Sequence, residues 1–409
     1  MNEQLIPVLL GADLNCYNVA RAFHEAYGVI SYAFGRYAIS ATKYSRIIRF
    51  TAVPDMDDEA VCLKTLTDFA DAHPAAKLIL FACTDDYAAM MIHLKDKLPR
   101  YIAPCPSEAI LDSVSKKAEF YEVCEKYGIP YPKTVVLTEP VCADALSEEL
   151  LGFAYPIIVK PSSSVVYWKH PFDGMKKVYF ADTPADAEAI LREIYAAGYD
   201  DKMILQERIE GGDAHMRVLT AFSDAKGKVR AMCLGHTMIE EHTPKGLGNH
   251  AAIVTEPLTN LPFADKIRAM LEDVGYTGFS NFDIKFTGRD GDFRIFEINL
   301  RQGRSNFYVT ASGINIAKLA TEVYLSSGDD CILGEKPHFW HLVPRSVAYT
   351  YTEDDALVAT AKSLAKAGKD TSSLLYKPDL MWNPMRLICV LEVLRRQKGK
   401  FKKYYPKKP

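Results

Sequence analysis

The sequence predicts a mixed α/β (α+β) protein made of several packed units. At 409 residues the chain is too long for one ordinary hydrophobic core, so two to four units are expected. Near the N-terminus, apolar segments at 5–11 and 77–83 are each followed by an amphipathic helical segment, at 15–27 and 87–98. Alternation of this kind predicts a parallel sheet whose strand ends open onto a ligand crevice.

Two acidic residues follow these apolar strands directly. Asp13 comes after the first strand and Asp85 after the second. At the carboxyl ends of parallel strands, both would lie at the crevice and could contact a ligand. Capping of the helix that follows each of them is an equally good explanation of both residues.

The rest of the chain continues the mixed pattern. Residues 107–137 combine a helix, ended by Gly and Pro, with a short strand, and further strands are expected at 155–161 and 205–209. A helix then leads into the strands near residue 280, and another follows at 313–324. Beyond it, helical patterns near 353–367 and 384–396 predict a separate C-terminal cap.

Composition places the chain among globular proteins. The hydrophobic share of 48% and the charged share of 25% exclude a disordered or fibrous class. No basic segment followed by an apolar run opens the chain, and no apolar run approaches the roughly 18 residues of a membrane span. The nine cysteines contain no CxxC pair, which is typical of reduced, buried thiols. We therefore expect a cytoplasmic protein.

Charge is unevenly distributed along the chain. Residues 395–409 hold eight basic and no acidic residues, which leaves −11 (−3 less 8) for the rest. Because the basic residues gather only at this end of an acidic body, nucleic acid is a poor partner. The basic tail follows an apolar helix, so weak contact with an anionic membrane surface is one interpretation. Attraction of an anionic substrate is another, and a core helix with a solvated tail is a third.

The strongest chemical signal lies between residues 281 and 305. Glu297 and Asn299 are two residues apart on a predicted strand and therefore share one face. Asp283 lies on the preceding predicted strand, and a hairpin through a Gly-Arg-Asp-Gly turn would bring the three side chains together. Carboxylate and amide oxygens are the ligands that hard divalent cations prefer. Taken alone, Asp283 could equally be a surface acid beside a turn.

This constellation resembles that of the ATP-grasp superfamily, in which an Asp on one strand and a Glu-x-Asn on the next hold the magnesium of ATP. The resemblance implies ATP and two Mg²⁺ ions, with Mn²⁺ as the alternative metal, at Asp283, Glu297 and Asn299. The turn that follows is similar to the glycine turn of D-alanine:D-alanine ligases, which lets the backbone N–H of Gly303 approach the reacting carbonyl.

The same resemblance implies a domain organisation. An ATP-grasp fold would begin with a Rossmann-like pre-ATP-grasp domain at 1–106. An ATP-grasp pair with the nucleotide and metal site would follow at 107–330, and a helical cap with the basic tail at 331–409.

Lys160 lies in an otherwise apolar strand, where a buried ammonium needs an anionic partner such as a phosphate. In the superfamily a lysine at this place contacts the ATP phosphates. A second one heads the preceding helix, where it matches Lys117, with Lys116 as a rival. The glycine-rich loop that usually follows reads PSSSVVYWKH here, so Ser162 and Ser163 are expected to bind phosphate through hydroxyl and backbone groups.

The adenine pocket of the superfamily is an extended hinge. In this chain it would run from Gln206 to Ile209, with Glu207, Glu210 or Asp213 directed toward the ribose. From the residues alone, the segment is only a strand followed by a Gly-Gly turn.

Three arginines are candidates for binding the acid substrate or its acyl-phosphate. Arg301 and Arg304 flank the glycine turn, and Arg217 alternates with apolar residues on a strand expected to face the same cavity. A surface position is the alternative for Arg217. The loop at 242–250 is polar and glycine-rich, so it would act as a lid from which Lys245 reaches the γ-phosphate, unless it is an ordinary mobile loop.

Longer stretches resemble one branch of the superfamily, the D-aspartate ligases of Gram-positive bacteria, over most of residues 1–325. They include IPVLLGADLNCYNVARAFHEAYG, YTGFSNFDIKF and FEINLRQGRSNFYVT. This resemblance implies that ATP phosphorylates the β-carboxylate of D-aspartate, and that a lysine ε-amine of the peptidoglycan precursor UDP-N-acetylmuramyl pentapeptide (UDP-MurNAc-pentapeptide) then attacks. Two alternatives stay open: a ligase of the same chemistry with another acid or amine, and a nucleotide-binding regulator without turnover.

Overall fold

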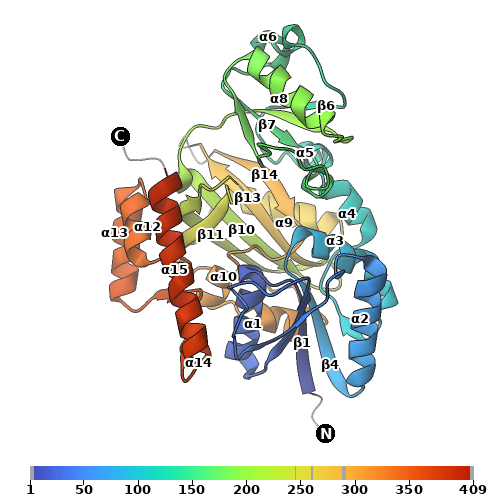
Figure 1. Cartoon of the computed structure of the whole chain (residues 1–409), viewed down its shortest axis with the longest axis vertical. Coiled ribbons are helices and arrows are strands. Elements are labelled where there is room, and N and C mark those ends of the chain that lie inside the picture. Colours follow the sequence, from blue (N-terminus) through green and yellow to red (C-terminus); the bar gives the residue numbers. More distant parts are fainter. Residues whose placement is uncertain (1–3, 245, 259–260, 288–291, 406–409) are drawn as a thin grey trace.

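The computed structural model describes residues 4–244, 246–258, 261–287 and 292–405 (Figure 1). Its N-terminal part is a five-stranded parallel sheet in the order β3-β2-β1-β4-β5. The parallel sheet expected from the alternating pattern is thereby confirmed. Its strands are β1 Gln4–Leu10, β2 Ser31–Gly35, β3 Ile48–Ala52, β4 Ala76–Ala82 and β5 Tyr101–Ile102, and its helices are α1 Leu14–Tyr27, α2 Glu59–Ala72 and α3 Asp85–Leu94.

A four-stranded antiparallel sheet forms the lobe at the top of Figure 1. Its order is β6-β9-β7-β8, and helix α8 covers it with Ala187, Leu191 and Ile194. Helices α4 and α5 lead from the N-terminal sheet to this lobe. The elements are α4 Glu108–Val114, α5 Lys117–Lys126, β6 Thr134–Leu137, α6 Glu148–Leu151, β7 Ile157–Pro161, α7 Ser164–Tyr167, β8 Tyr179–Ala181, α8 Pro184–Ala196 and β9 Met203–Glu207.

The largest sheet has eight strands. Seven follow the order β14-β13-β10-β11-β12-β16-β17, and β15 pairs with β11. Its elements are β10 Met216–Ser223, β11 Val229–Glu241, β12 Asn249–Glu256, α9 Pro262–Asp273, β13 Gly278–Phe286, β14 Phe293–Asn299, α10 Phe307–Ala311, α11 Ile316–Lys318, β15 Ile332–Leu333, β16 Phe339–His341 and β17 Asp370–Ser372. The expected strand pair near residue 280 is present as β13 and β14, while its turn at 288–291 lies outside the described residues.

The C-terminal region contains strands as well as the helices expected for a cap. Strands β16 and β17 extend the large sheet, because β16 pairs with β12 and β17 with β16. Four helices accompany them: α12 Arg345–Tyr351, α13 Asp355–Lys366, α14 Lys377–Leu380 and α15 Pro384–Tyr404. Helix α15 continues well past the predicted end at 396, so most of the basic tail is helical. Domain boundaries near 106 and 330 stay a proposal.

Hydrophobic contacts join the N-terminal sheet to the large sheet. Leu80 of β4, Phe120 of α5 and Phe282 of β13 belong to one buried cluster, and Phe81 of β4 shares another with Tyr308 of α10. These contacts bring the carboxyl end of β4 close to β13 and β14. In the part of the chain that the structure describes, no helix combines the length and the unbroken apolar character that crossing a bilayer requires.

Candidate active site

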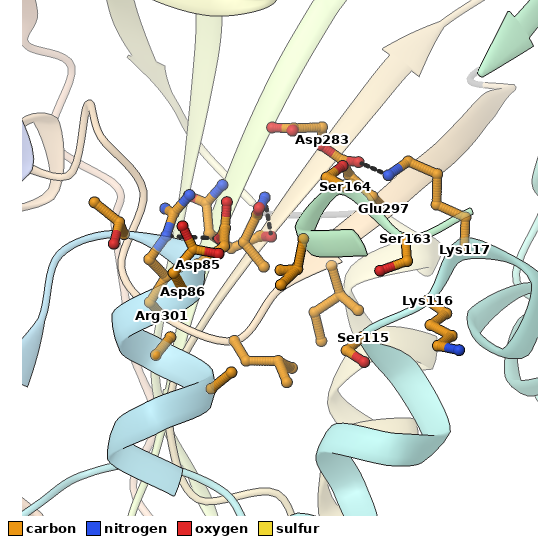
Figure 2. Close-up of a pocket in the computed structure, with 18 of the residues that line it drawn as sticks. Asp85, Asp86, Ser115, Lys116, Lys117, Ser163, Ser164, Asp283, Glu297 and Arg301 are labelled. Carbon is orange, nitrogen blue, oxygen red and sulfur yellow. Dashed lines mark hydrogen bonds and ion pairs between the residues drawn. The ribbon is translucent and has the colours of Figure 1, made fainter. Parts of the chain in front are cut away.

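A cavity of about 500 Å³ lies at this junction (Figure 2). Helix α3 contributes Asp85 and Asp86 to its wall, and the start of α5 contributes Lys117. Strands β13 and β14 contribute Asp283, Glu297 and Asn299. The three residues expected to ligate magnesium therefore line one cavity with Lys117.

Strand register explains this grouping. Asp283 pairs with Glu297, and Asn281 pairs with Asn299, in the antiparallel ladder of β13 and β14. Residues directly opposite each other on neighbouring strands point to the same face of a sheet. The two carboxylates are therefore neighbours, with the amide of Asn299 two residues further along the same face.

Cations compensate these carboxylates. Lys117 Nζ lies 2.8 Å from Glu297 Oε2 (Figure 2). Burial alone would raise the pKa of Glu297, but Lys117 and Lys177 hold it below its ordinary value. Burial and the charge of Glu297 raise the pKa of Asp283, against the opposing effect of His250. The cavity therefore concentrates two carboxylates and several cations within one buried space.

The residues present fit a magnesium–nucleotide complex. Carboxylate and amide oxygens are the hard ligands that Mg²⁺ prefers, and it usually shares them with substrate phosphates and water. The lysines that now face Glu297 have the charge needed beside a triphosphate. Among the described residues, no group of three or more His, Cys, Asp or Glu side chains forms a metal site. An amide and nucleotide oxygens would have to complete the set.

Lys160 lies deeper in the lobe, outside the wall of the cavity. Its Nζ donates to Gln206 Oε1 at 2.8 Å, and Gln206 Nε2 donates to the hydroxyl of Tyr121 at 2.9 Å. Burial and the nearby Lys117 lower the pKa of Lys160 to about 7. The expected buried lysine is thus present, paired with a neutral amide.

The serine loop has a different local role from the one expected. Ser162 is fully buried, and its Oγ accepts from the backbone N–H of Ala118 at 3.1 Å, which fixes the start of α5. Ser163 caps the short helix α7 by accepting from Val166 N, although it also lines the cavity. Direct phosphate binding by Ser162 is therefore not supported, because the hydroxyl is enclosed between two elements.

The hinge residues also lie away from the cavity wall. Glu207 N donates to the carbonyl of Lys133 at 3.0 Å, and the carbonyl of Ile209 accepts from Lys285 Nζ at 2.9 Å. Asp213 is buried, and it accepts from the N–H of Glu240 and from the hydroxyl of Tyr405. This corrects the expectation for Asp213, whose carboxylate joins β11 to the C-terminal helix. Lys245 lies outside the described residues.

Arg217 was expected to face the cavity, and the structure corrects this expectation. Val218 pairs with Asp283, so Val218 shares the face of the metal-binding residues and Arg217 points to the opposite face. There, Arg217 Nε lies 2.7 Å from Glu256 Oε2, and His236 lies 2.6 Å from the same carboxylate.

The glycine turn lies on the cavity wall as a unit, with Arg301, Gly303 and Arg304. Arg301 Nε lies 2.8 Å from Asp85 Oδ1, so the turn contacts the N-terminal sheet's helix α3 (Figure 2). A Cβ at Gly303 would overlap the amide oxygen of Asn281, which explains why the close approach requires glycine.

The two acids that follow the N-terminal strands differ in role. Asp13 caps α1 by accepting from Cys16 N, as the capping explanation proposed. Thr84, instead of Asp85, caps α3, and Asp85 is directed toward Arg301. Of the two, only Asp85 lines the cavity.

Sequence reasoning did not identify two charged residues of the site. Burial opposes the charge of Lys177, yet Glu297, Asp283 and Asp85 raise its pKa above the ordinary value. His250 lies 3.2 Å from Glu240 Oε1 and 3.5 Å from Asp283 Oδ1, and despite burial these carboxylates raise its pKa to about 10. Only the pairing of β11 with β12 reveals His250, since no local motif marks it.

Similarity to known proteins defines the class and then the family. No family model matches the chain. The L-amino acid ligase from Bacillus licheniformis has a TM-score of 0.55 at 12% identity, covering 80% of this chain and 75% of that one. The biotin carboxylase domain of 2-oxoglutarate carboxylase from Hydrogenobacter thermophilus has a TM-score of 0.58 at 14% identity, covering 79% and 71%. These similarities show the ATP-grasp fold.

A sequence relative narrows the class. The D-aspartate ligase of Enterococcus faecium (strain Aus0004) is 36% identical over 414 residues, which cover 99% of this chain and 97% of that protein. The chain therefore belongs to the D-aspartate ligase family, and it is an ATP-dependent carboxylate-amine ligase.

Proposed function

We propose that this ligase joins the β-carboxylate of D-aspartate to an amine, with ATP as the energy source. A carboxylate oxygen attacks the γ-phosphorus of ATP and releases ADP. The amine then attacks the acyl carbon, phosphate leaves, and the amine loses a proton to give the amide. The observation that supports this most is the single cavity in which Asp283, Glu297 and Asn299 lie beside the turn of Arg301 and Gly303.

Each group has a role that follows from its chemistry. Asp283, Glu297 and Asn299 would hold two Mg²⁺ ions, or Mn²⁺ in their place, and bound metal would neutralise the charge on the triphosphate. Lys117 lies 2.8 Å from Glu297, so it would supply a cation to phosphate oxygens bound at the metal. The Gly303 N–H and Arg304 would stabilise the oxyanion that forms during amine attack.

The acid substrate would bind between α3 and the glycine turn. Aspartate carries two carboxylates and an ammonium, so its site needs at least one fixed cation and one anion. Arg301 and Asp85 provide both, 2.8 Å apart on the cavity wall. A zwitterionic substrate could replace this ion pair by binding each partner separately. Asp13 is a weaker candidate for the ammonium, because its carboxylate already caps α1.

We propose the ε-amine of the stem-peptide lysine in UDP-MurNAc-pentapeptide as the acceptor, which would place the protein in peptidoglycan (cell-wall) biosynthesis. This step rests on membership of the D-aspartate ligase family. The basic residues of α15 would favour an anionic partner, either this nucleotide-linked acceptor or a membrane surface.

An acid and amine screen tests the proposal. Purified protein with ATP and magnesium should release ADP only when D-aspartate and a lysine-containing muramyl pentapeptide are both present. Faster turnover with another acid or amine would show that the protein is a ligase of different specificity. Tight ATP binding without turnover on any pair would favour a nucleotide-binding regulator.

The Glu297→Gln variant tests the site itself. The substitution keeps the shape of the side chain but removes the charge that Lys117 and the metal would share. We expect ADP release to fall about 100-fold or more while the circular dichroism spectrum is unchanged. Glu392→Gln, at an exposed surface ion pair far along the chain, is the matched control. Normal turnover by Glu297→Gln would contradict the metal assignment.

A further inference from the structure

The corner between α14 and α15 exposes an unusual number of large apolar side chains. Trp382 is 83% exposed, Ile388 62%, Leu391 53% and Met385 52%. On α15 the latter three are spaced by three residues, so they lie along one outward side of the helix. A cluster of large exposed apolar side chains points to an interaction site. We call Met381, Trp382, Met385, Ile388 and Leu391 the α15 patch.

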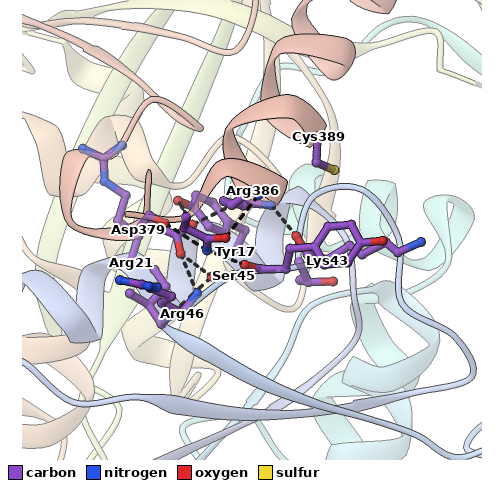
Figure 3. Close-up of polar contacts among 12 residues, drawn as sticks. Tyr17, Arg21, Lys43, Ser45, Arg46, Asp379, Arg386 and Cys389 are labelled. Carbon is purple, nitrogen blue, oxygen red and sulfur yellow. Dashed lines mark hydrogen bonds and ion pairs between the residues drawn. The ribbon is translucent and has the colours of Figure 1, made fainter. Parts of the chain in front are cut away.

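The inward side of the same helix holds a buried ion pair beside apolar residues such as Val390 and Phe401. Arg386 is fully buried there, with Nε 2.8 Å from Oδ2 of the equally buried Asp379 (Figure 3). Arg386 Nη1 also donates to the carbonyls of Ser40 and Lys43. Rotating the helix to hide the apolar patch would pull this ion pair apart, and an unpaired buried charge is strongly unfavourable. The patch is therefore held outward.

The backbone conformation also keeps Trp382 directed outward, as the buried ion pair does for the rest of the α15 patch. Its φ is 60°, a left-handed conformation that is costly for a bulky residue. Arg46 stabilises it, because Nη2 donates to the carbonyl of Trp382 at 2.8 Å and Nη1 to that of Met381 at 3.1 Å. Asp379 Oδ1 in turn accepts from the N–H of Arg46 at 2.7 Å (Figure 3). A strained corner is thus fixed in a position that presents an indole ring to solvent.

Positive charge continues from the patch along the helix. The exposed residues Arg395, Arg396, Lys398, Lys402 and Lys403 follow Leu391 on α15. Glu392 is the acid of this helix, and it is already paired with Arg395 and Arg396 at 2.6 and 2.7 Å. The rest of the chain is acidic, so this face differs in sign from the body. An aromatic and aliphatic tip followed by cations matches the interface of an anionic bilayer.

We propose that the α15 patch and the basic residues after it bind the surface of an anionic membrane. Trp382, Met385 and Ile388 enter the boundary between headgroups and acyl chains, and the cations of the second half of α15 face lipid phosphates. The protein lies on the bilayer without crossing it. A symmetric contact between two copies is the weaker fit, because it would bring two basic helices together.

Vesicle sedimentation tests the proposal on the full chain. Wild-type protein should bind vesicles of phosphatidylglycerol and phosphatidylcholine, bind pure phosphatidylcholine weakly, and be released by high salt. Trp382→Ala with Ile388→Ser should lower the partition coefficient at least about tenfold. Lys402→Ala with Lys403→Ala should lower it about 30-fold, from about 1 kcal/mol for each charge near an anionic surface.

Matched controls separate the patch from surface hydrophobicity in general. Leu150→Ser with Leu325→Ser removes two apolar side chains that are 66% and 62% exposed elsewhere, and it should leave binding unchanged. ADP release in solution should be normal in Trp382→Ala with Ile388→Ser and in the leucine control, and the lysine variant should keep the wild-type circular dichroism spectrum, which shows that all three fold. In the wild type, brominated lipids should quench the fluorescence of the exposed Trp382 indole, a readout that needs no variant.

Three results would overturn the proposal. Wild-type protein could bind anionic and neutral vesicles equally poorly. The patch variants could bind anionic vesicles as well as the wild type does. Light scattering could show a wild-type dimer that Trp382→Ala with Ile388→Ser converts to a monomer, which would assign the patch to a second copy of the chain.

Discussion

Replacing Lys160 by Met tests how the buried charge of this lysine is linked to nucleotide binding. Burial, and then the nearby Lys117, lower the pKa of Lys160 from 10.5 to about 7. Its hydrogen-bond acceptor is the neutral Gln206 Oε1 at 2.8 Å, which cannot balance an ammonium. The charges of Lys117 and Glu297 act on Lys160 although it lies behind the cavity wall, so an ATP phosphate bound beside these residues would favour its charged form and raise its pKa. We therefore expect nucleotide binding to be accompanied by proton uptake.

The size of this uptake follows from the pKa. At pH 8, one unit above a pKa of about 7, Lys160 is neutral in about nine-tenths of the nucleotide-free protein. At pH 6 it is neutral in about one-tenth. Binding should therefore take up about 0.9 proton at pH 8 and about 0.1 at pH 6. Calorimetry of ATP binding in two buffers of different ionisation enthalpy measures this number directly.

Lys160→Met is the required comparison, because proton changes of the nucleotide and of other groups cancel in the difference between the two proteins. The wild type should exceed the variant by an amount that grows from pH 6 to pH 8. Equal uptake by both proteins across this range would refute the reasoning.

The pH dependence of the free energy of unfolding gives a second measure of the protonation of Lys160. The folded pKa lies below the unfolded one, so the unfolded state binds more protons between pH 7 and 10.5. Lys160 therefore makes the nucleotide-free protein more stable as pH rises through this window. Below pH 7, where Lys160 is charged, it lowers the free energy of unfolding by its full amount, on the order of a few kcal/mol. In Lys160→Met, the free energy of unfolding should lose this part of its pH dependence.

Three further substitutions distinguish residues that act in the reaction from residues that stabilise the fold. Gly303→Ala places a Cβ against an asparagine amide oxygen, so ADP release should fall about 100-fold, whereas normal release would refute a close backbone approach. Arg217→Met should leave KM for the acid within about twofold, because Arg217 lies outside the cavity, and should lower the free energy of unfolding by about 1–2 kcal/mol in urea titration. Arg386→Met should cost about 3–5 kcal/mol in the same titration, since it leaves the buried charge of Asp379 without its cation. Arg386→Met with Asp379→Leu should recover only part of this loss, because Asp379 also accepts from Tyr17, Ser45 and the N–H of Arg46.

Local patterns predicted the elements that carry their own signal. Strands β1 and β4 are continuous apolar runs, and each precedes an amphipathic helix, so a parallel sheet followed from the sequence. Strands β2 and β3 have five residues each and lack such a run, so they were not identified. The grouping of Glu297 with Asn299 followed from the two-residue period of a strand, and Asp283 joined them through the expected hairpin of neighbouring strands.

Side chains whose role depends on a distant partner could not be placed in this way. Arg217 is one strand position away from Val218, the residue that pairs with Asp283, and only the register of β10 against β13 decides which face it occupies. His250 reaches Asp283 only because β11 and β12 pair as they do. Asp85 required knowledge of where Arg301 lies, since capping explained the isolated residue equally well.

The serine loop after β7 stands where the superfamily usually has a glycine-rich loop, and this departure bears on the alternative of a nucleotide-binding regulator. In the structure these serines stabilise two helix ends. Ser162 fixes the start of α5 by accepting from Ala118 N, and Ser163 caps α7. The first of these contacts also positions Lys117, because Lys117 is the first residue of α5 and its Nζ lies 2.8 Å from Glu297. A loop of glycines could not supply either hydroxyl. The serines therefore help to build the charged wall that phosphoryl transfer needs, and they give no reason to expect binding without turnover.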